Sequence, residues 1–168
     1  KWIPNERGNK WIKLKPDYMP NKDLDCVIIG GFYGTGKKRG GKISQYLLGI
    51  VEAPPEGAPP GTLPTHVMSF SKVGIGMSDK VLGELREKLN DHMVSAGKNL
   101  RPPKCYKVTG AAAERPDVWI SHPSESVVLT VKADVRLVPS NTFYSPYSLR
   151  FPRVTGMNWN KPRDEELS

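Results

Sequence analysis

The sequence predicts a mostly β protein: a five-stranded Greek-key barrel with one helix and long loops. Three observations lead to this class. Apolar runs of strand length recur along the chain, one segment alone has helical periodicity, and 16 prolines and 16 glycines imply many turns. With 168 residues, the chain is long enough to bury the core of one ordinary domain.

The first two strands are expected at 25–33 and 45–51. The run Val27-Ile28-Ile29 is typical of a buried strand, and 34–44 then becomes the loop between the two strands. The segment 53–64 holds five prolines and two glycines, which predicts a mobile excursion without regular structure.

A third strand is expected at 65–76, and a helix follows it. Ser78 offers an N-cap, and Asp79 complements the helix dipole. The predicted inner face of the helix consists of Val81, Leu82, Leu85, Leu89, His92 and Met93.

After a basic loop at 97–107, two further strands are expected at 118–120 and 126–138, with Trp119 in the core. Alternate residues of the second strand are apolar. Three strands, a helix and two strands is the order of an oligonucleotide-binding (OB) fold, a partly open Greek-key barrel used for nucleic acid.

The net charge of +8 indicates an anionic partner, although ribosomal contact, membrane headgroups or plain solubility would give a similar number. Cys26 and Cys105 have no CxxC neighbour, which excludes a cysteine-rich zinc site and favours a reducing compartment. The three histidines, His66, His92 and His122, lack metal-ligand spacing.

No run of about 18 apolar residues is present, so no transmembrane helix is predicted. The chain begins at Lys1, without Met and without a signal-peptide pattern. We therefore expect a segment of a longer intracellular protein.

Lys13 and Lys15 lie two residues apart in the string Trp-Ile-Lys-Leu-Lys-Pro-Asp-Tyr at 11–18, so a strand would project both ammonium groups from one face. Such cations repel each other unless an anion, such as a nucleotide phosphate, lies between them. On spacing alone, a solvated strand face is the commoner explanation.

The loop 34–42 is the most basic part of the chain. Its four cations, without an acid, are Lys37, Lys38, Arg39 and Lys42. A glycine-rich backbone with this charge suits close approach to a nucleic-acid backbone, and a solubilising turn is the alternative. The spacing from Gly36 to Lys42 matches a phosphate-binding P-loop, but Ile43 stands where Ser or Thr should bind magnesium.

Arg150 and Arg153 stand on either side of the apolar pair Phe151-Pro152. Guanidinium groups bind phosphates in a planar, two-point geometry that lysine cannot copy. A pair of surface arginines beside an aromatic anchor is the commoner meaning of such a string.

These strings resemble motifs of ATP-dependent DNA ligases. The segment 11–18 is similar to the last motif of their nucleotidyltransferase domain, and 149–153 is similar to the motif that closes their OB domain. The string at 27–34 with its basic loop is similar to the start of the OB domain in the DNA ligase IV branch. The segments 115–120 and 126–134 are similar to later strands of that domain.

The resemblance implies that Lys13 and Lys15 contact the nucleotide phosphate and that Arg150 and Arg153 orient the pyrophosphate leaving group. The nucleotide-binding residues implied in this way are Lys13, Lys15, Arg150, Arg153 and Lys161. The DNA-binding residues expected are Lys37, Lys38, Arg39, Lys42 and Lys132. Asn158 and Asn160 depart from the family pattern, which usually has an Arg and an Asp upstream of the lysine matched by Lys161.

The resemblance also implies four parts: the end of the nucleotidyltransferase domain at 1–16, a hinge at 17–24, the OB domain at 25–154 and a tail at 155–168. The parent enzyme would use ATP and Mg²⁺ to adenylate a lysine, pass AMP to a 5′-phosphate and seal nicked or broken duplex DNA. Its pathway would be nuclear non-homologous end joining, with a scaffold protein bound through other regions and no membrane contact.

The nucleophile motif of these enzymes, Lys-x-Asp-Gly, does not occur here, so the segment alone is predicted to be inactive and to bind no cofactor tightly. Two alternatives remain open. One is a stand-alone OB module that stacks single-stranded bases on Tyr33, Tyr46 and Phe70. The other is the OB domain of an mRNA-capping guanylyltransferase.

Overall fold

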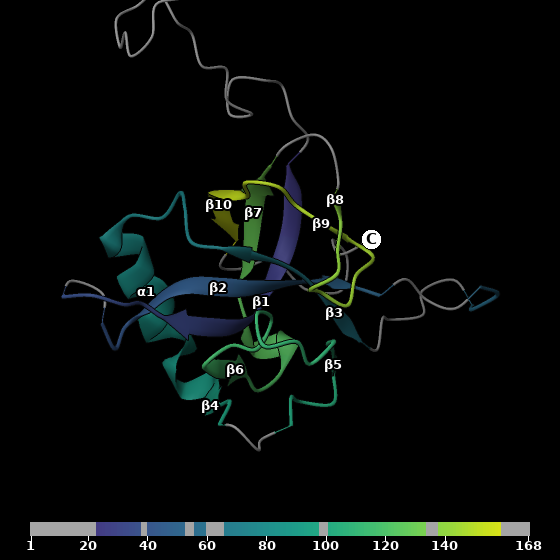
Figure 1. Ribbon diagram of the computed structural model, residues 1–168, viewed down its shortest axis with the longest axis horizontal. Coiled ribbons are helices and arrows are strands. Elements are labelled where there is room, and N and C mark those ends of the chain that lie inside the picture. Colours follow the sequence, from purple (N-terminus) through teal and green to yellow (C-terminus); the bar gives the residue numbers. More distant parts are fainter. Residues whose placement is uncertain are drawn as a thin grey trace, which may run out of the picture.

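The computed structural model describes residues 23–37, 40–52, 56–59, 66–97, 101–133 and 138–158. It confirms the predicted class: a curled, mostly β fold with one α-helix (Figure 1). The elements are β1 Leu24–Tyr33, β2 Ile43–Val51, β3 Val67–Val73, α1 Asp79–Leu89, the 3-10 helix η2 Asn90–His92, β4 Met93–Ser95, β5 Tyr106–Lys107, β6 Val118–Ile120, the 3-10 helix η3 Pro123–Glu125, β7 Val128–Lys132, β8 Val138–Pro139, β9 Tyr147–Ser148 and β10 Arg153–Asn158.

β1 is the central strand and pairs with three others. The main sheet has the order β10-β7-β1-β2-β3-β5, and β6 pairs with both β1 and β4. One edge of β1 pairs with β2, whereas the other pairs with β7 from Leu24 to Val27 and with β6 at Gly30 and Gly31. Because its two halves have different partners, the sheet curls, and β7 stands nearly upright where β2 lies across the view in Figure 1.

Both faces of β1 are buried, which explains its continuous apolar run. Cys26 and Ile28 pack inside the curl with three leucines of α1, namely Leu82, Leu85 and Leu89. Val27 and Ile29 face a second cluster that includes Tyr106 and Trp119, whose rings stack with centroids 6.0 Å apart. Trp119 is 3% exposed, so its predicted place in the core is confirmed.

The helix begins as predicted and ends earlier. The hydroxyl oxygen of Ser78 accepts a hydrogen bond of 3.3 Å from the amide of Val81, which caps the first turn. The predicted face is wrong at its far end, because His92 lies in η2 and Met93 opens β4 opposite Ile120. Asn, Asp and His favour helix poorly, and Met93 gains ladder hydrogen bonds instead.

The later strands differ from the predictions where pairing is non-local. Tyr106 and Lys107, expected in a loop, form β5 parallel to β3. The long strand expected at 126–138 ends at Lys132, and β8 pairs with β9 in a separate sheet. β10 pairs with β7, so the domain boundary expected after residue 154 falls inside a strand.

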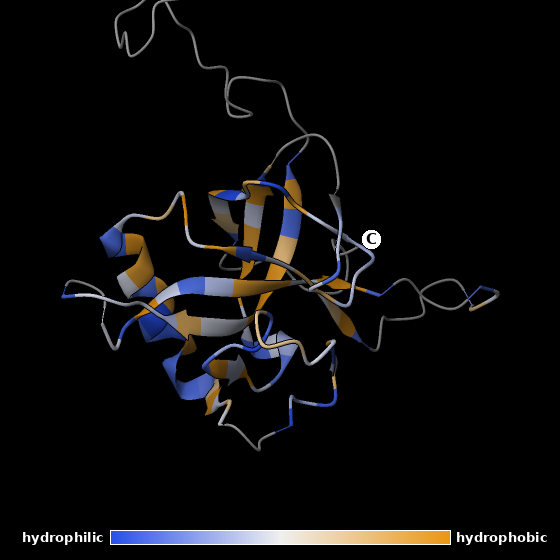
Figure 2. Cartoon of the chain, in the orientation of Figure 1, coloured by the Kyte–Doolittle hydropathy of each residue, from blue (hydrophilic) through white to orange (hydrophobic). Residues whose placement is uncertain are grey.

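Other predicted features lie outside the described residues. These are the segment 11–16 with Lys13 and Lys15, the part 17–22 of the hinge and most of the excursion at 53–64. In the described part, the helices are too short and too polar to cross a bilayer. Figure 2 shows apolar residues concentrated in the strands and hydrophilic ones on the outer side of α1.

Candidate functional site

Arg150 and Arg153 lie in a segment, 149–153, that we call the arginine segment. Arg153 opens β10 directly opposite Lys132 of β7. Directly opposed residues of an antiparallel pair project from the same face, so these two cations are neighbours. Lys132 Nζ lies 3.7 Å from Asp23 Oδ1. The structure thus brings Lys132 and Arg153 together at this end of the sheet.

The middle of the arginine segment is exposed and strained. Arg150 is exposed, and its guanidinium carbon lies 5.2 Å from the centre of the Phe151 ring. Phe151 is 70% exposed and has a φ of 54°, in the left-handed region that residues with a Cβ adopt rarely. Val154 donates its amide to the carbonyl of Ile75 at 3.0 Å, which ties β10 to the turn after β3.

A buried carboxylate, Glu114, supports the loop that leads into this segment. Glu114 is 1% exposed. Its Oε2 accepts the amides of Thr109 at 2.7 Å and Gly110 at 3.0 Å, and the Thr109 hydroxyl at 2.6 Å. Its Oε1 accepts the hydroxyl of Ser69 in β3. These four donors satisfy the hydrogen-bonding capacity of a buried anion.

Ser69, which is bound to Glu114, also forms hydrogen bonds with the loop 140–146. The amide of Tyr144 donates to Ser69 Oγ at 2.9 Å, and the amide of Ser145 donates to the Ser69 carbonyl at 3.0 Å. Thr109 Oγ1 lies 2.9 Å from the carbonyl oxygen of Thr142. Sequence reasoning missed Glu114, because an acid after three alanines has no local mark of burial.

The basic loop, residues 34–42, is closed by its backbone. Gly34 donates to the Lys42 carbonyl at 2.8 Å, and Gly40 donates to the Gly36 carbonyl at 2.9 Å. Lys37 and Lys42 are exposed, and no carboxylate of the described residues forms an ion pair with either. A strand, β2, follows the loop, whereas a P-loop leads into a helix.

The two basic regions lie at opposite ends of β1. The basic loop follows Tyr33, whereas Lys132 and Arg153 lie beyond the Leu24 end, and the two regions are well separated in Figure 1. The structure therefore groups Lys132 with Arg153. The other candidates, Lys13, Lys15, Lys38, Arg39 and Lys161, fall outside the described residues.

A stand-alone module for single strands is expected to stack bases on Tyr33, Tyr46 and Phe70. The structure does not bring these three rings together on the surface. Tyr46 is fully buried and Phe70 is 3% exposed, because both belong to the interior of the curl, whereas Tyr33 is accessible, at 48%. The prediction of a stacking platform among these three rings is therefore wrong.

The remaining titratable groups form no further site within the described ranges, where no group of three His, Cys, Asp or Glu side chains is arranged to hold a metal ion. His66 lies beside Glu52 at 3.7 Å, and His92 lies beside Glu125 at 3.6 Å. Both cysteines are free thiols, and burial raises the pKa of Cys26 to about 12.

Solved structures share this fold. The ligase domain of LigD from M. tuberculosis gives a TM-score of 0.56 at 19% identity, covering 83% of this chain and 36% of that one. A mycobacterial DNA ligase D complexed with ATP and MES gives 0.55 at 20% identity, covering 84% and 36%. The chain thus has the fold of part of a DNA ligase domain. No family model matched it.

Sequence relatives narrow this class. The chain is 42% identical to DNA ligase 4 of Arabidopsis thaliana over 99% of its length, and 35% identical to DNA ligase 4 of Homo sapiens over 90%. It spans 14% and 16% of those proteins. The chain is therefore a relative of the DNA ligase 4 family and corresponds to one segment of its members.

Proposed function

We propose that the chain is the OB domain of an ATP-dependent DNA ligase of the DNA ligase 4 type. The observation that carries this proposal is the arginine segment. Arg150 is exposed and Arg153 adjoins Lys132, while the loop before them is anchored to Glu114 and Ser69. Cations held in a fixed geometry suit a polyphosphate, whose charge they neutralise while they orient its leaving group.

The proposal assigns a second role to the basic loop. Exposed lysines that have no carboxylate partner among the described residues, on a loop closed by its backbone, suit duplex DNA, which presents evenly spaced phosphates. Because the arginine segment and this loop lie at opposite ends of β1, one domain orientation would serve nucleotide transfer and another would serve DNA. A hinge at 17–24 would separate the two orientations.

The remaining assignments follow from the same relationship. Residues 1–16 would end the nucleotidyltransferase domain, with Lys13 and Lys15 on the nucleotide, and Lys161 would act from the tail at 155–168. The parent enzyme would use ATP and Mg²⁺ in nuclear non-homologous end joining, recruited by a scaffold protein. This segment alone would neither self-adenylate nor seal DNA. The relatives favour a ligase over a capping guanylyltransferase.

The test of the arginine segment is Arg150→Ala in the full-length enzyme. We expect loss of lysine adenylation, measured as transfer of labelled AMP from ATP, with sealing of a pre-adenylated nick retained. Lys80→Ala on α1, a solvated lysine with a side chain 86% exposed, is the matched control. Equal loss of both steps would contradict the proposal.

The test of the basic loop is the salt dependence of duplex binding. Paired Lys37→Ala and Lys42→Ala substitutions should reduce the slope of log affinity against log salt by about 0.9 for each phosphate that the variant no longer neutralises. Stability should stay within about 0.5 kcal/mol, because both side chains are exposed. An unchanged slope would remove the loop from the DNA interface.

A further inference from the structure

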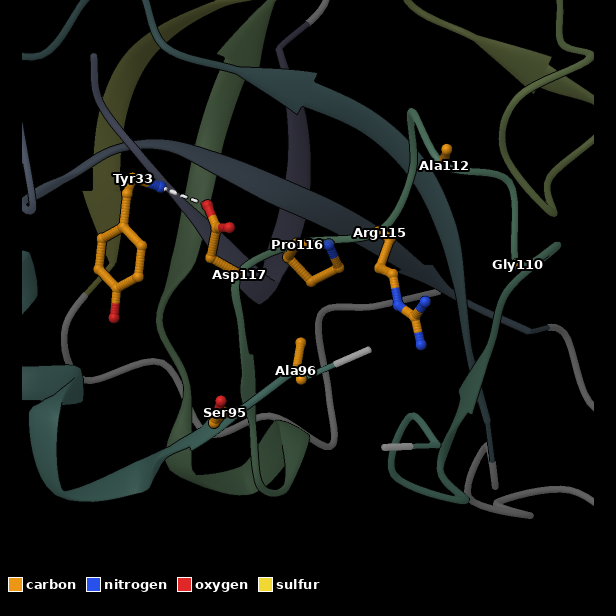
Figure 3. Close-up of a pocket in the computed structure, with 9 residues that line it drawn as sticks. Tyr33, Ser95, Ala96, Gly110, Ala112, Arg115, Pro116 and Asp117 are labelled. Carbon is orange, nitrogen blue, oxygen red and sulfur yellow. Dashed lines mark hydrogen bonds between the residues drawn. The ribbon is translucent and has the colours of Figure 1, made fainter. Parts of the chain in front are cut away.

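A shallow hollow lies beside the base of the basic loop. It has a volume of about 500 Å³ and is bordered by the end of β1, the end of β4 and the connection before β6. Figure 3 shows Tyr33 on one side, Arg115 on the other and Pro116 between them, with Ser95 and Ala96 along the lower rim. This volume falls within the range of about 300–1,000 Å³ that is usual for small-molecule sites.

The floor of the hollow is rigid. Asp117 Oδ2 accepts the backbone amide of Tyr33 at 2.7 Å, and the Asp117 carbonyl accepts the amide of Ala96 at 2.9 Å. A Cβ on Gly30 would lie 2.7 Å from Pro116 Cγ, so β1 and Pro116 are in close contact. Tyr33 is therefore fixed through its backbone while the residue remains 48% exposed.

Charge is distributed unevenly across the hollow. The Asp117 carboxylate lies at the Tyr33 side, and the Arg115 guanidinium lies at the far side (Figure 3). An anionic group would be repelled near Asp117 and attracted near Arg115. A fitting ligand therefore places a neutral ring against Tyr33 and an anionic group toward Arg115.

We infer that this hollow holds one unpaired nucleotide of a DNA strand, with its base on Tyr33 and its phosphate toward Arg115. The inference rests on the proposed DNA-binding function and deepens it. Bases stack on exposed aromatic rings largely irrespective of sequence, and guanidinium groups bind phosphate. Gly34 and Lys42 close the basic loop directly after Tyr33, so the hollow adjoins the loop that is proposed to hold the duplex.

An acidic peptide with an aromatic residue could satisfy the same two contacts. Nucleic acid is favoured because the adjoining lysines, Lys37 and Lys42, add positive charge without a carboxylate partner in the described part of the chain. The net charge of +8 acts in the same direction. The hollow also lies apart from the arginine segment, because the two are at opposite ends of β1.

The experiment compares a blunt duplex with the same duplex carrying a short unpaired tail, by fluorescence anisotropy at fixed salt on the 168-residue chain. We expect the tail to raise affinity about fivefold or more. Tyr33→Ala should abolish this advantage and Tyr33→Phe should keep it, because the ring is the contact. Arg115→Ala should reduce it. The controls Tyr147→Ala and Arg101→Ala, at exposed positions outside the hollow, should leave it unchanged.

Amide chemical shifts give a second, local measurement. The tailed duplex should shift Ala96 and Gly97 in the wild type but not in Tyr33→Ala, which retains the backbone bond to Asp117. Equal affinities for blunt and tailed duplex, or a tail advantage that survives Tyr33→Ala, would overturn the inference. A peptide that shifts these amides when unpaired DNA does not would also overturn it.

The outcomes separate this inference from the proposed function. If Lys37→Ala and Lys42→Ala weaken duplex binding while the tail has no effect, the basic loop keeps its role and the hollow loses its nucleotide. If the tail advantage depends on Tyr33 but duplex affinity is unchanged in both lysine variants, the nucleotide site in the hollow is supported and the DNA-binding role of the basic loop is refuted.

Discussion

The arginine segment and the basic loop both present exposed cations, yet different interactions hold them. The loop that leads into the arginine segment is held by the side chains of Glu114 and Ser69, which accept the amides of Thr109, Gly110 and Tyr144. One backbone bond, from the Ser145 amide to the Ser69 carbonyl, adds to them. The basic loop is closed by backbone hydrogen bonds between Gly34 and Lys42 and between Gly36 and Gly40. A buried side-chain network specifies one geometry, whereas a glycine-rich loop follows the shape of what it binds.

This difference matches the two ligands proposed. A triphosphate is compact, and a leaving group must be oriented, so its cations benefit from preorganisation. A duplex backbone is a repeated charge, and phosphate contacts position it without demanding one geometry. The comparison predicts that perturbing the buried network of Glu114 and Ser69 affects the arginine segment and not the basic loop.

The largest effect is expected from Glu114→Ala. Removing the carboxylate leaves the Ser69 hydroxyl and the amides of Thr109 and Gly110 without their acceptor, which should lower the free energy of unfolding by about 3 kcal/mol. Urea unfolding measures the loss. Hydrogen exchange should accelerate at Tyr144 and Ser145 and not at Gly34.

Glu114→Gln is the matched control. A glutamine can keep its oxygen toward Thr109 and Gly110 and turn its amide toward Ser69, so we expect a loss of about 1 kcal/mol. If both variants exchanged at Gly34 as fast as at Tyr144, the two regions would not be held independently, and the comparison would fail.

A second pair of variants compares Gly76, which contacts β10 next to the arginine segment, with Gly41 of the basic loop. Gly76 has a φ of 96°, and a Cβ there would lie 2.2 Å from the Val154 carbonyl oxygen of β10. Gly41 of the basic loop has a φ of 72° with nothing within 4 Å. Gly76→Ala should cost about 3 kcal/mol and Gly41→Ala about 1 kcal/mol in unfolding free energy. Equal losses of unfolding free energy in urea titrations would show that the positive φ alone sets the cost and that the contact with β10 adds nothing.

A pH effect should act on both regions, because β1 joins them. Burial, with a smaller contribution from Asp25, raises the pKa of Cys26 from 9.0 to about 12. Between these values the unfolded thiol loses its proton while the folded one keeps it, so stability falls as pH rises. We expect a loss of about 1 kcal/mol at pH 10, measured by urea unfolding.

Cys26→Ala is the control for this pH effect. Burial also raises the pKa values of Tyr46 and Tyr106 from 10.0, so these groups act mainly above pH 10 and the informative comparison is the slope between pH 9 and 10. The slope should be flatter in Cys26→Ala than in the wild type. Parallel slopes would show that another group controls alkaline unfolding.

Local signals in the sequence were enough for part of this fold. β1 and β2 contain apolar runs, β3 has apolar residues at Val67, Phe70 and Val73 between Pro64 and Gly74, and Ser78 caps α1. Each of these elements could be predicted from its own residues. β10 could not, because Arg153, Gly156 and Asn158 interrupt its apolar pattern. Its stability comes from pairing with β7, which lies more than twenty residues earlier.

The candidate site was predictable in its exposed charges and not in its supports. Lys37, Lys42, Arg150 and Arg153 stand in recognisable strings; the first three are exposed, and Arg153 is half-buried. The burial of Glu114 depends on a β3 serine 45 residues away, and the neighbourhood of Lys132 and Arg153 depends on strand register. Such relations arise from tertiary structure and leave no mark in a local window.

The smallest effect, and the one that most sharpens the comparison, is expected from Phe151→Gly. The basic loop places glycines at its positive φ positions, Gly36 and Gly41, whereas the arginine segment places an aromatic residue at a φ of 54°. The left-handed conformation costs a residue with a Cβ about 1 kcal/mol, and Phe151 regains little by packing because it is 70% exposed. Phe151→Gly should therefore raise the free energy of unfolding by up to about 1 kcal/mol in urea titrations. A decrease instead would mean that the ring packs on Arg150 strongly enough to offset the strain, which a parallel loss in Arg150→Ala would reveal.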